Sequence, residues 1–321
     1  MLTYTLRKLI QVPFLLFGVV VVLFLLVHLA PGDPVAALLG DAPASPEFIE
    51  EFRRHLGLDR PLHEQFLLYV WNVLHGDLGT SYYYSQSVLT LILERFPPTL
   101  LLMTSALVAA TLIGIVLGVV AAARPNSAVD AGANLFAIVG YSLPVFWLGE
   151  LALLVFALNL DWFPVQGVNS LRESYTGPAD VLDRAHHLVL PAFVLATRYI
   201  AIDFRLTRSG ILEVLSQEYI LTARAKGLAS RVVLFRHALR NALLPVVTVT
   251  GLNVGFALSG AVLTEVVFGW PGLGRLTLDA IAHRDSPVLM GIFLFVTTAV
   301  VLVNFITDLV YAMVDPRIRL K

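Results

Sequence analysis

Long apolar blocks separated by polar stretches dominate the pattern along this chain. Four blocks contain no charged side chain, and they cover residues 97–123, 131–149, 241–264 and 286–307. A fifth block, 13–30, contains one polar side chain, that of His28. Each is long enough for a helix that crosses about 30 Å of bilayer hydrocarbon, which takes roughly 17–25 residues. A sixth block, 188–202, is shorter and contains Arg198, so the pattern predicts an all-α membrane protein with six transmembrane helices.

The same pattern divides the chain into three regions. Residues 1–30 form an N-terminal segment and the first transmembrane helix, 31–96 an extracytoplasmic excursion, and 97–321 a core with five transmembrane helices. Within the excursion, apolar residues every three or four positions predict a short amphipathic helix over 47–58. The first apolar block exceeds the 7–15 residues of a signal peptide's apolar region, so a retained first helix is favoured.

Small residues recur every four positions in two of the predicted spans. Close contact between helices in lipid depends on small residues that let the backbones approach. The repeat therefore predicts packing faces rather than lipid-facing ones. Its members are Ala106, Ala110, Gly114, Gly118 and Ala122 in the second span, and Gly251, Gly255 and Ser259 in the fifth.

The composition agrees with a membrane location. Hydrophobic residues make up 57% of the 321 positions and charged residues 14%, with a mean hydropathy of +0.79, whereas soluble domains carry about 25% charged residues. A net charge of −1 argues against a nucleic-acid-binding protein, which needs a concentrated basic face. The absence of cysteine excludes disulfides and thiolate metal sites.

Lysine and arginine are unevenly distributed between the two sides of the predicted membrane domain. One side comprises residues 1–8, 124–130, 204–240 and 314–321, and these 60 residues contain 13 of the 22 basic side chains. The 118 residues of the other side contain 8. Because basic residues favour the cytoplasmic side, we predict that both termini and loop 204–240 are cytoplasmic.

The most unusual segment lies in this predicted cytoplasmic loop. Residues 213–226 are rich in helix-forming side chains and predict one helix, with Gly227 as the residue that follows its end. Because the side chains of Thr222 and Ala223 are small, this part of the helix would project little and could lie in a groove of another protein. Arg224 and Lys226 add positive charge. The alternative is that these charges only follow the preference of basic residues for the cytoplasm.

This segment resembles the coupling loop of permeases in binding-protein-dependent ABC importers, within the dipeptide/oligopeptide/nickel subfamily. The resemblance lies in Thr222 to Gly227 (TARAKG) and Arg236 to Pro245 (RHALRNALLP), with one departure at Leu221, where the family has a glutamate. Further matches occur in order and cover nearly the whole chain. They are residues 28–34 (HLAPGDP), 56–61 (LGLDRP), 76–81 (GDLGTS), 190–191 (LP), 265–274 (EVVFGWPGLG), 284–285 (RD) and 315–319 (DPRIR).

The resemblance implies a type I ABC importer permease fold in the bacterial inner membrane. Its partners would be a second homologous permease subunit, two ATPase subunits, an extracytoplasmic substrate-binding protein and membrane lipid. The sequence contains no G-x-x-x-x-G-K-[ST] motif, so this chain would need no cofactor, and ATP with Mg²⁺ would bind the ATPase subunits. The implied ATPase-coupling residues are Tyr219, Leu221, Thr222, Ala223, Arg224, Ala225, Lys226 and Gly227.

Glu150 is the first candidate for the translocation path, because a carboxylate within a span is costly and usually faces protein or water. It would contact the amino group of a substrate. The alternatives are a place near the outer interface or a structural pair with Arg198. Weaker path candidates are Ser142, Thr248, Asn253 and Asn304.

Two other groups of residues lie at predicted membrane boundaries. Trp270 lies in the outer turn 269–274, near the place where the binding protein docks in the resembled family, and is a candidate interface residue. Asp203, Arg205 and Arg208 follow the end of the apolar block 188–202 and are expected to be interfacial.

Catalytic patterns are missing from the sequence. It contains no H-E-x-x-H, and the adjacent His186 and His187 would diverge on a helix rather than bind one metal. We therefore expect a non-catalytic subunit without a metal site. The resemblance implies import of di- or oligopeptides, with nickel, glutathione, opines or haem as alternative substrates. A secondary carrier that works without ATP would show more ionisable groups within spans and an inverted repeat.

Overall fold

The computed structural model describes residues 2–29, 45–55, 59–170 and 175–314, and their side chains except at 2–9, 52, 55, 258–260 and 308–314. All regular elements in these ranges are helices, and Thr80 and Ser87 form an isolated antiparallel bridge. The chain packs as two compact units: unit 1 is Met1–Pro97 with Gly272–Phe305, and unit 2 is Pro98–Pro271 with Ile306–Lys321. The three-region division drawn from the sequence stays a prediction.

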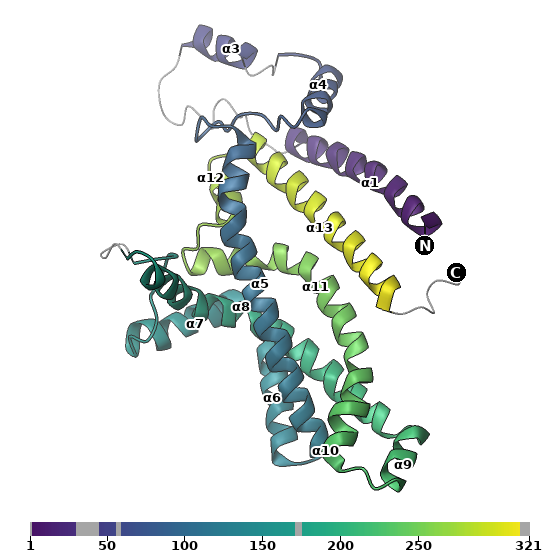
Figure 1. Cartoon of the computed structure of the whole chain (residues 1–321). Helices are drawn as coiled ribbons and strands as arrows, with labels where there is room; N and C mark the ends of the chain where they lie inside the picture. Colours follow the sequence, from purple (N-terminus) through teal and green to yellow (C-terminus); the bar gives the residue numbers. More distant parts are fainter. Residues whose placement is uncertain (1, 30–44, 56–58, 171–174, 315–321) are drawn as a thin grey trace. The chain divides into compact units, whose positions relative to one another are not determined.

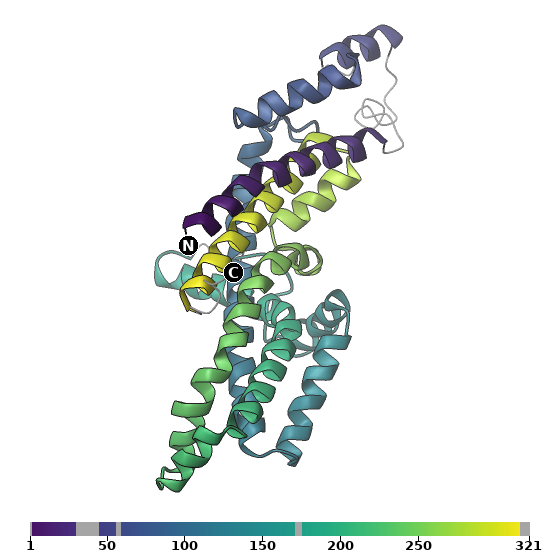
Figure 2. The ribbon, with the colours of Figure 1, turned by 90° about the vertical axis from the view of Figure 1, so that its right-hand side faces the viewer.

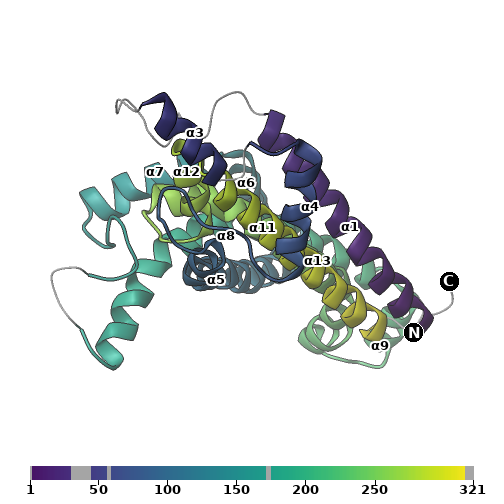
Figure 3. The same cartoon turned by 90° about the horizontal axis from the view of Figure 1, so that it is seen from above.

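Unit 1 contains the N-terminal helices and two helices from the end of the chain. Helix α5 (Val88–Ala123) starts here and continues into unit 2. Helices α1 and α13 lie alongside each other (Figures 1 and 3). The amphipathic helix predicted over 47–58 is present as α3, while 56–58 lie outside the described residues. The other helices of unit 1 are α1 (Leu2–Leu29), α3 (Pro46–His55), α4 (Leu62–Leu74), α12 (Leu273–Ala282) and α13 (Ser286–Val314), whose residues from Ile306 onward belong to unit 2.

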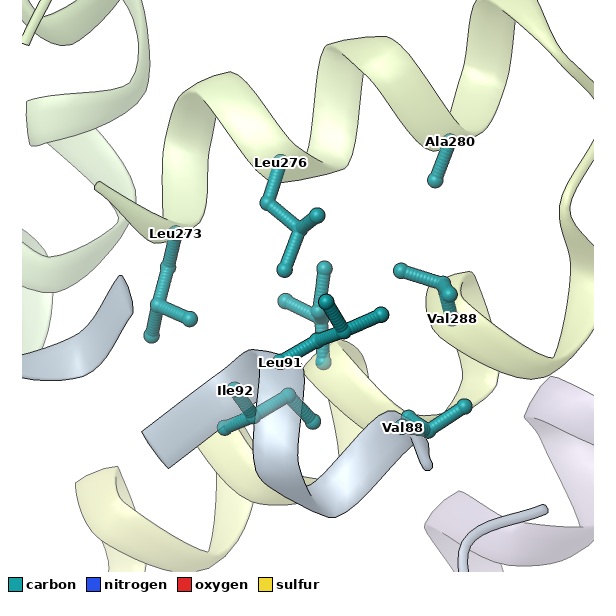
Figure 4. Packing of buried hydrophobic residues seen from close by; sticks show 8 residues of the cluster. Val88, Leu91, Ile92, Leu273, Leu276, Ala280 and Val288 are labelled. Atoms are coloured by element: carbon teal, nitrogen blue, oxygen red, sulfur yellow. The ribbon is translucent and has the colours of Figure 1, made fainter. Parts of the chain in front are cut away.

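The core of unit 1 is an aliphatic cluster between the start of α5, α12 and the start of α13. Leu91 of α5, Leu276 of α12 and Val288 of α13 point toward one another (Figure 4). Their burial removes apolar surface from solvent and joins the excursion to the C-terminal helices. The buried members are Val88, Leu91, Ile92, Leu273, Leu276, Ala280, Val288 and Ile292.

A buried aspartate adds polar contacts to this junction. Asp285, 1% exposed, accepts hydrogen bonds from Ser81 Oγ (2.5 Å), the backbone N–H of Tyr83 (3.1 Å) and that of Val288 (3.4 Å). The Tyr83 ring stacks on His283 with centroids 3.7 Å apart. Burial, and then the negative charge of Asp285, raise the pKa of Tyr82 to about 12. Two of the motifs noted in the sequence, 76–81 and 284–285, therefore meet at one carboxylate.

Unit 2 is a helical bundle in which α5, α6, α8 and α11 run along one another (Figures 1 and 2). Short helices, two of them π-helical (η1 and η2), connect or extend the long ones. The elements are α6 (Ala128–Ser142), α7 (Val145–Ala152), η1 (Leu153–Asn159), α8 (Pro178–Leu215), α9 (Glu218–Ala225), α10 (Ser230–Val232), η2 (Val233–Leu239) and α11 (Arg240–Val267).

Among the described residues, five helices are long and apolar enough to cross a membrane: Ile10–Leu29, Val88–Ala123, Pro178–Leu215, Ser230–Ala257 and Ser286–Thr307. The pair Ala128–Ser142 and Val145–Asn159 makes a sixth span if it is counted as one. On that count the prediction of six is confirmed.

The prediction of a continuous third helix over 131–149 is wrong. The two parts of this span are bent by 107° at Leu143 and Pro144. Pro144 has no N–H to donate, and its ring disfavours the helical conformation of the residue before it. Leu143 is accordingly extended, with ψ 135°.

The small-residue face predicted on α5 is confirmed as a packing face. Its five members are buried. A Cβ atom at Gly114 would lie 2.7 Å from the Cβ of Asp203, and one at Gly118 would lie 2.6 Å from the Cβ of Thr207. Helix α8 therefore approaches α5 more closely than any side chain on α5 would allow. On α11, Gly251 meets Thr307 in the same way, while the side chain of Ser259 lies outside the described residues.

Replacing Gly118 with leucine should separate α5 from α8 and destabilise unit 2. Overpacking typically costs about 1–3 kcal/mol. At Gly118 the added side chain would meet backbone as well as side-chain atoms of α8. Thermal unfolding of the detergent-solubilised protein measures the effect. Gly132→Leu is the matched control, since a Cβ there meets nothing within 4 Å. Equal melting of the two variants would contradict the close packing.

Candidate functional site

The helix predicted over 213–226 is interrupted, so the prediction of one helix there is wrong. Helix α8 ends at Leu215 and α9 begins at Glu218. Between them, the Ser216 hydroxyl donates to the carbonyl of Glu213 at 2.7 Å, and Gln217 is extended. Serine competes with the backbone for hydrogen bonds in this way and favours a helix end. The interruption makes α9 a separate short helix.

Helix α9 ends in a Schellman motif around Gly227, as the sequence predicts for that glycine. Gly227 has φ +77°, and its N–H bonds the carbonyl of Arg224 at 2.9 Å. The N–H of Leu228 bonds the carbonyl of Ala223 at 3.4 Å. This pair of bonds fixes the end of the helix with a residue in the left-handed region, where glycine is favoured.

One face of α9 packs on its own chain. Ile220 and Ala223 are buried against Val233 of η2, with Val214 and Leu215 of α8 beside them. The idea that Ala223 presents a low surface to another protein is therefore wrong, because its methyl group faces inward. The exposed residues of the predicted coupling set are Tyr219, Leu221, Thr222, Arg224, Ala225, Lys226 and Gly227. We call these seven residues the α9 surface.

The α9 surface lies at the same end of unit 2 as the connection between α5 and α6 (Figure 1). A cavity of about 830 Å³ lies between these segments. Arg124, Arg224 and Arg231 line it together with apolar residues of α5, α8 and η2, and the described part of its lining contains no acidic residue. The charged groups on the wall of this cavity are therefore basic.

A second cavity, of about 430 Å³, lies beside the break between α6 and α7. We call it the break cavity. Three elements of unit 2 form it, and its lining residues are Val145 of α7, Leu195, Arg198, Tyr199 and Ile202 of α8, and Asn253 and Phe256 of α11.

Asn253 is the predicted path residue that this cavity contains. It is 7% exposed, and its Nδ2 has no hydrogen-bond partner among the residues that the structure describes. The guanidinium of Arg198 lies 5.7 Å from the centre of the Tyr141 ring, and that of Arg205 lies 5.1 Å from the same ring. Both contacts are in the range of cation–π attraction.

The other path candidates do not line the break cavity. Glu150 is exposed on α7, and within the described residues no ion pair joins it to Arg198. Ser142 is exposed at the end of α6, and the Thr248 hydroxyl donates to the carbonyl of Leu244 at 3.0 Å. Asn304 belongs to unit 1. Their part in a path stays a prediction.

The side chain of Trp270 is not on the surface, so its predicted place at the binding-protein interface is wrong. It is 1% exposed, and its Nε1–H donates to the carbonyl of Pro98 at 2.9 Å. Nearby, the buried Glu265 accepts a hydrogen bond from Thr99 Oγ1 at 2.6 Å. These contacts hold the end of α11 to α5 and give Trp270 a structural role.

The expectation that Asp203 and Arg208 are interfacial is also wrong, because both make contacts inside the bundle. Asp203, 1% exposed, accepts hydrogen bonds from the hydroxyls of Thr111 (3.0 Å) and Thr250 (3.5 Å). Arg208 donates from Nε and Nη2 to the two carboxylate oxygens of Asp130, at 2.6 and 2.7 Å. The apolar block ends at residue 202, but the helix continues to 215, and Asp203 and Arg208 on this part of it bond other helices of the bundle.

Comparison with known proteins agrees with this architecture. The profile of the family described as "Binding-protein-dependent transport system inner membrane component" matches residues 114–320, and that of its N-terminal region matches 1–103. The chain is 43% identical to "Di/tripeptide transport system permease protein DppB" of Pseudomonas aeruginosa, with 99% of each chain covered. It is 44% identical to "Dipeptide transport system permease protein DppB" of Escherichia coli K12 over the full length of both.

Two further comparisons extend this result. "Oligopeptide transport system permease protein AppB" of Bacillus subtilis is 43% identical, with 98% of each chain covered. A solved structure described as "Inward facing conformations of the MetNI methionine ABC transporter" is similar in fold, with a TM-score of 0.56 over 71% of this chain and 97% of that one, at 16% identity. Three permeases are 43–44% identical to this chain over nearly their full length, and two family profiles match residues 1–103 and 114–320. The chain belongs to the family of inner-membrane permease components of binding-protein-dependent transport systems.

Proposed function

We propose that this chain is one permease subunit of an ATP-driven importer of di- or oligopeptides. The observation that carries the proposal is 43–44% identity over 98–100% of the chain to relatives named as dipeptide, di/tripeptide and oligopeptide permeases. Helices that suit a membrane make up most of the chain, and the family supplies the context of a binding protein. The chain then performs no bond chemistry and couples two conformations of a path.

In this proposal ATP and Mg²⁺ bind two partner ATPase subunits, which dock on the α9 surface. A second permease subunit completes the path, and an extracytoplasmic binding protein delivers the peptide. The separation of α9 from α8, its fixed C-terminal end and its exposed residues support this assignment. Closure of the ATPase pair would move α9, and the packing of Ile220 and Ala223 on Val233 would pass that movement to η2 and α11.

Uptake by the reconstituted transporter tests the proposal. The chain is co-expressed with its partner subunits and placed in proteoliposomes, and entry of a labelled dipeptide is measured with ATP and with loaded binding protein. We expect uptake only when both are present. Uptake of nickel, glutathione or haem in place of peptide would change the substrate, and uptake without ATP would make the chain a secondary carrier.

The orientation can be tested with single cysteines, because the natural chain contains none. Ala229→Cys, beside the α9 surface, should resist an impermeant thiol reagent in intact cells, whereas Asn169→Cys should react; both residues are exposed. The reason is that the basic loops are placed inside. Reaction of Ala229→Cys from outside would overturn the orientation and the coupling role together.

A further inference from the structure

The break cavity presents positive charge and hydrogen-bond donors, and none of the described residues that line it is acidic. Three of the features that form it attract anions: an arginine, an amide with an unpaired N–H group, and the first turn of a helix. Each comes from a different element of unit 2, namely α8, α11 and α7.

Arg198 is the charged member of this group. It lies in the span Pro178–Leu215, and ionisable residues in spans commonly mark a substrate pathway and pair with an opposite charge. Among the described residues its contact is the ring of Tyr141, and no carboxylate forms an ion pair with it. A cation–π contact leaves the edge of the guanidinium, with its N–H groups, available to an anion.

Asn253 is the neutral member, and its state is unusual. Buried amide groups nearly always have hydrogen-bond partners, and each exception calls for an explanation. Asn253 is 7% exposed and lines the cavity, and within the described part of the chain its Nδ2 is unpaired. A ligand that accepts a hydrogen bond in the cavity would satisfy it.

The start of α7 is the third member. Val145, its first residue, lines the cavity, and Pro144 before it supplies no side-chain cap. The first N–H groups of a helix have no partner within the helix, and they carry a partial positive charge. Broken transmembrane helices in transporters use such ends to bind the anionic groups of substrates.

From this geometry we infer that the break cavity binds the C-terminal carboxylate of the transported peptide, with Arg198 as its charged partner and Asn253 as a neutral donor. The inference rests on the proposed function, whose substrate has one free carboxylate at its end. A volume of about 430 Å³ lies in the range of small-ligand pockets and suits the last one or two residues of a peptide.

Import assays with arginine variants test this inference. Arg198→Gln should lower kcat/KM for a dipeptide at least about 10-fold, since a hydrogen-bonded charge pair is lost. The kcat/KM of Arg198→Lys should lie between those of the wild type and Arg198→Gln, because lysine keeps the positive charge but lacks the planar guanidinium that can donate two hydrogen bonds to one carboxylate. The matched control is Arg205→Gln, which removes a cation from the same Tyr141 ring but not from the cavity lining. Its kcat/KM for the dipeptide should stay within about 2-fold of the wild-type value. ATP hydrolysis stimulated by loaded binding protein should persist in all three.

The chemistry of the ligand is tested with the same peptide bearing a C-terminal amide, supplied at a concentration that saturates the binding protein. Arg198→Gln should change import of the amide much less than import of the acid. A second readout uses Ile202→Cys in the cavity lining. The dipeptide, but not its amide, should slow maleimide labelling of this cysteine in the purified transporter, and Arg198→Gln should abolish the protection.

The outcomes separate the inference from the proposed function. If the wild-type transporter imports no peptide, the proposed function fails. If it imports peptide but Arg198→Gln leaves import of both the acid and the amide at the wild-type rate, or reduces both by the same factor, the carboxylate site is overturned and the proposed function stands. Loss confined to the acid, together with protection of Ile202→Cys, supports the site.

Discussion

Transport should stop when Leu221 is replaced by aspartate, while the chain still inserts and folds. Leu221 is 59% exposed on α9 and contributes nothing to the cluster that holds this helix to its own chain. In water an aspartate at this position is well solvated, so the isolated chain tolerates it. In a packed interface with an ATPase subunit, the unpaired carboxylate loses its water at a cost of several kcal/mol. Docking would therefore fail.

Three measurements on the Leu221→Asp transporter follow from this. Peptide uptake should fall to background, ATP hydrolysis should no longer respond to loaded binding protein, and the ATPase should separate from the permease during purification. Ala229→Asp, exposed but outside α9, is the control for added negative charge. Wild-type uptake by Leu221→Asp at matched abundance would remove the α9 surface from the coupling role.

The direction of the α9 faces decides how this test is designed. A bulky residue at Ala223 would also be expected to stop docking, but by displacing α9 from Val233, since Ala223 is 7% exposed and packs inward. Its effect would not separate an interface from a folding defect. The sequence offers both Ile220 and Leu221 as large apolar side chains, and only tertiary packing determines which of them is buried.

The spans were predictable because a bilayer admits few structures. Backbone groups in hydrocarbon must bond within the segment, so long uncharged blocks become helices. Their interruptions were not predictable by the same reasoning. Pro144, Pro191 and Pro245 all lie in apolar blocks, yet only Pro144 breaks its helix, while α8 and α11 continue through the other two. Neighbouring groups decide whether the carbonyl freed by a proline is satisfied, and the sequence does not show neighbours.

The break cavity depends on the same unpredictable break. Arg198 stood out in the sequence as a charge in a span, and Asn253 as a polar residue in another. The two residues come together because α8 lies against α11, and the cavity that they line also needs α7 to begin at Val145, after the bend. At Asp203 the sequence suggested an end of the span where the helix in fact continues. This residue follows the last apolar residue of its block, but its carboxylate bonds Thr111 and Thr250.

Replacing Asp285 with alanine should destabilise unit 1 on the order of 3 kcal/mol or more. The change removes the acceptor of the Ser81 hydroxyl and of the Tyr83 N–H, and an unsatisfied buried donor costs about 1–3 kcal/mol. It also removes the carboxylate that bonds the N–H of Val288 in the first turn of α13. Segment 76–87 should then detach from α12 and α13. Limited proteolysis and hydrogen exchange of the purified transporter measure that detachment.

Asp279→Ala is the matched control, because Asp279 lies on α12 and, among the described residues, accepts one longer hydrogen bond from segment 76–87, from the Tyr84 hydroxyl at 3.3 Å. Its effect should stay near 1 kcal/mol. The destabilisation of unit 1 by Asp285→Asn should lie between those of Asp285→Ala and Asp279→Ala. The amide of asparagine keeps one acceptor oxygen but cannot accept at both positions. Because Asp285 lies in unit 1 and the α9 surface in unit 2, Asp285→Ala should lower the amount of folded protein without separating the ATPase from the molecules that remain. If exchange in 76–87 is as slow in Asp285→Ala as in the natural chain, the carboxylate does not hold this segment, and the aliphatic cluster around Leu91 and Leu276 alone maintains the junction.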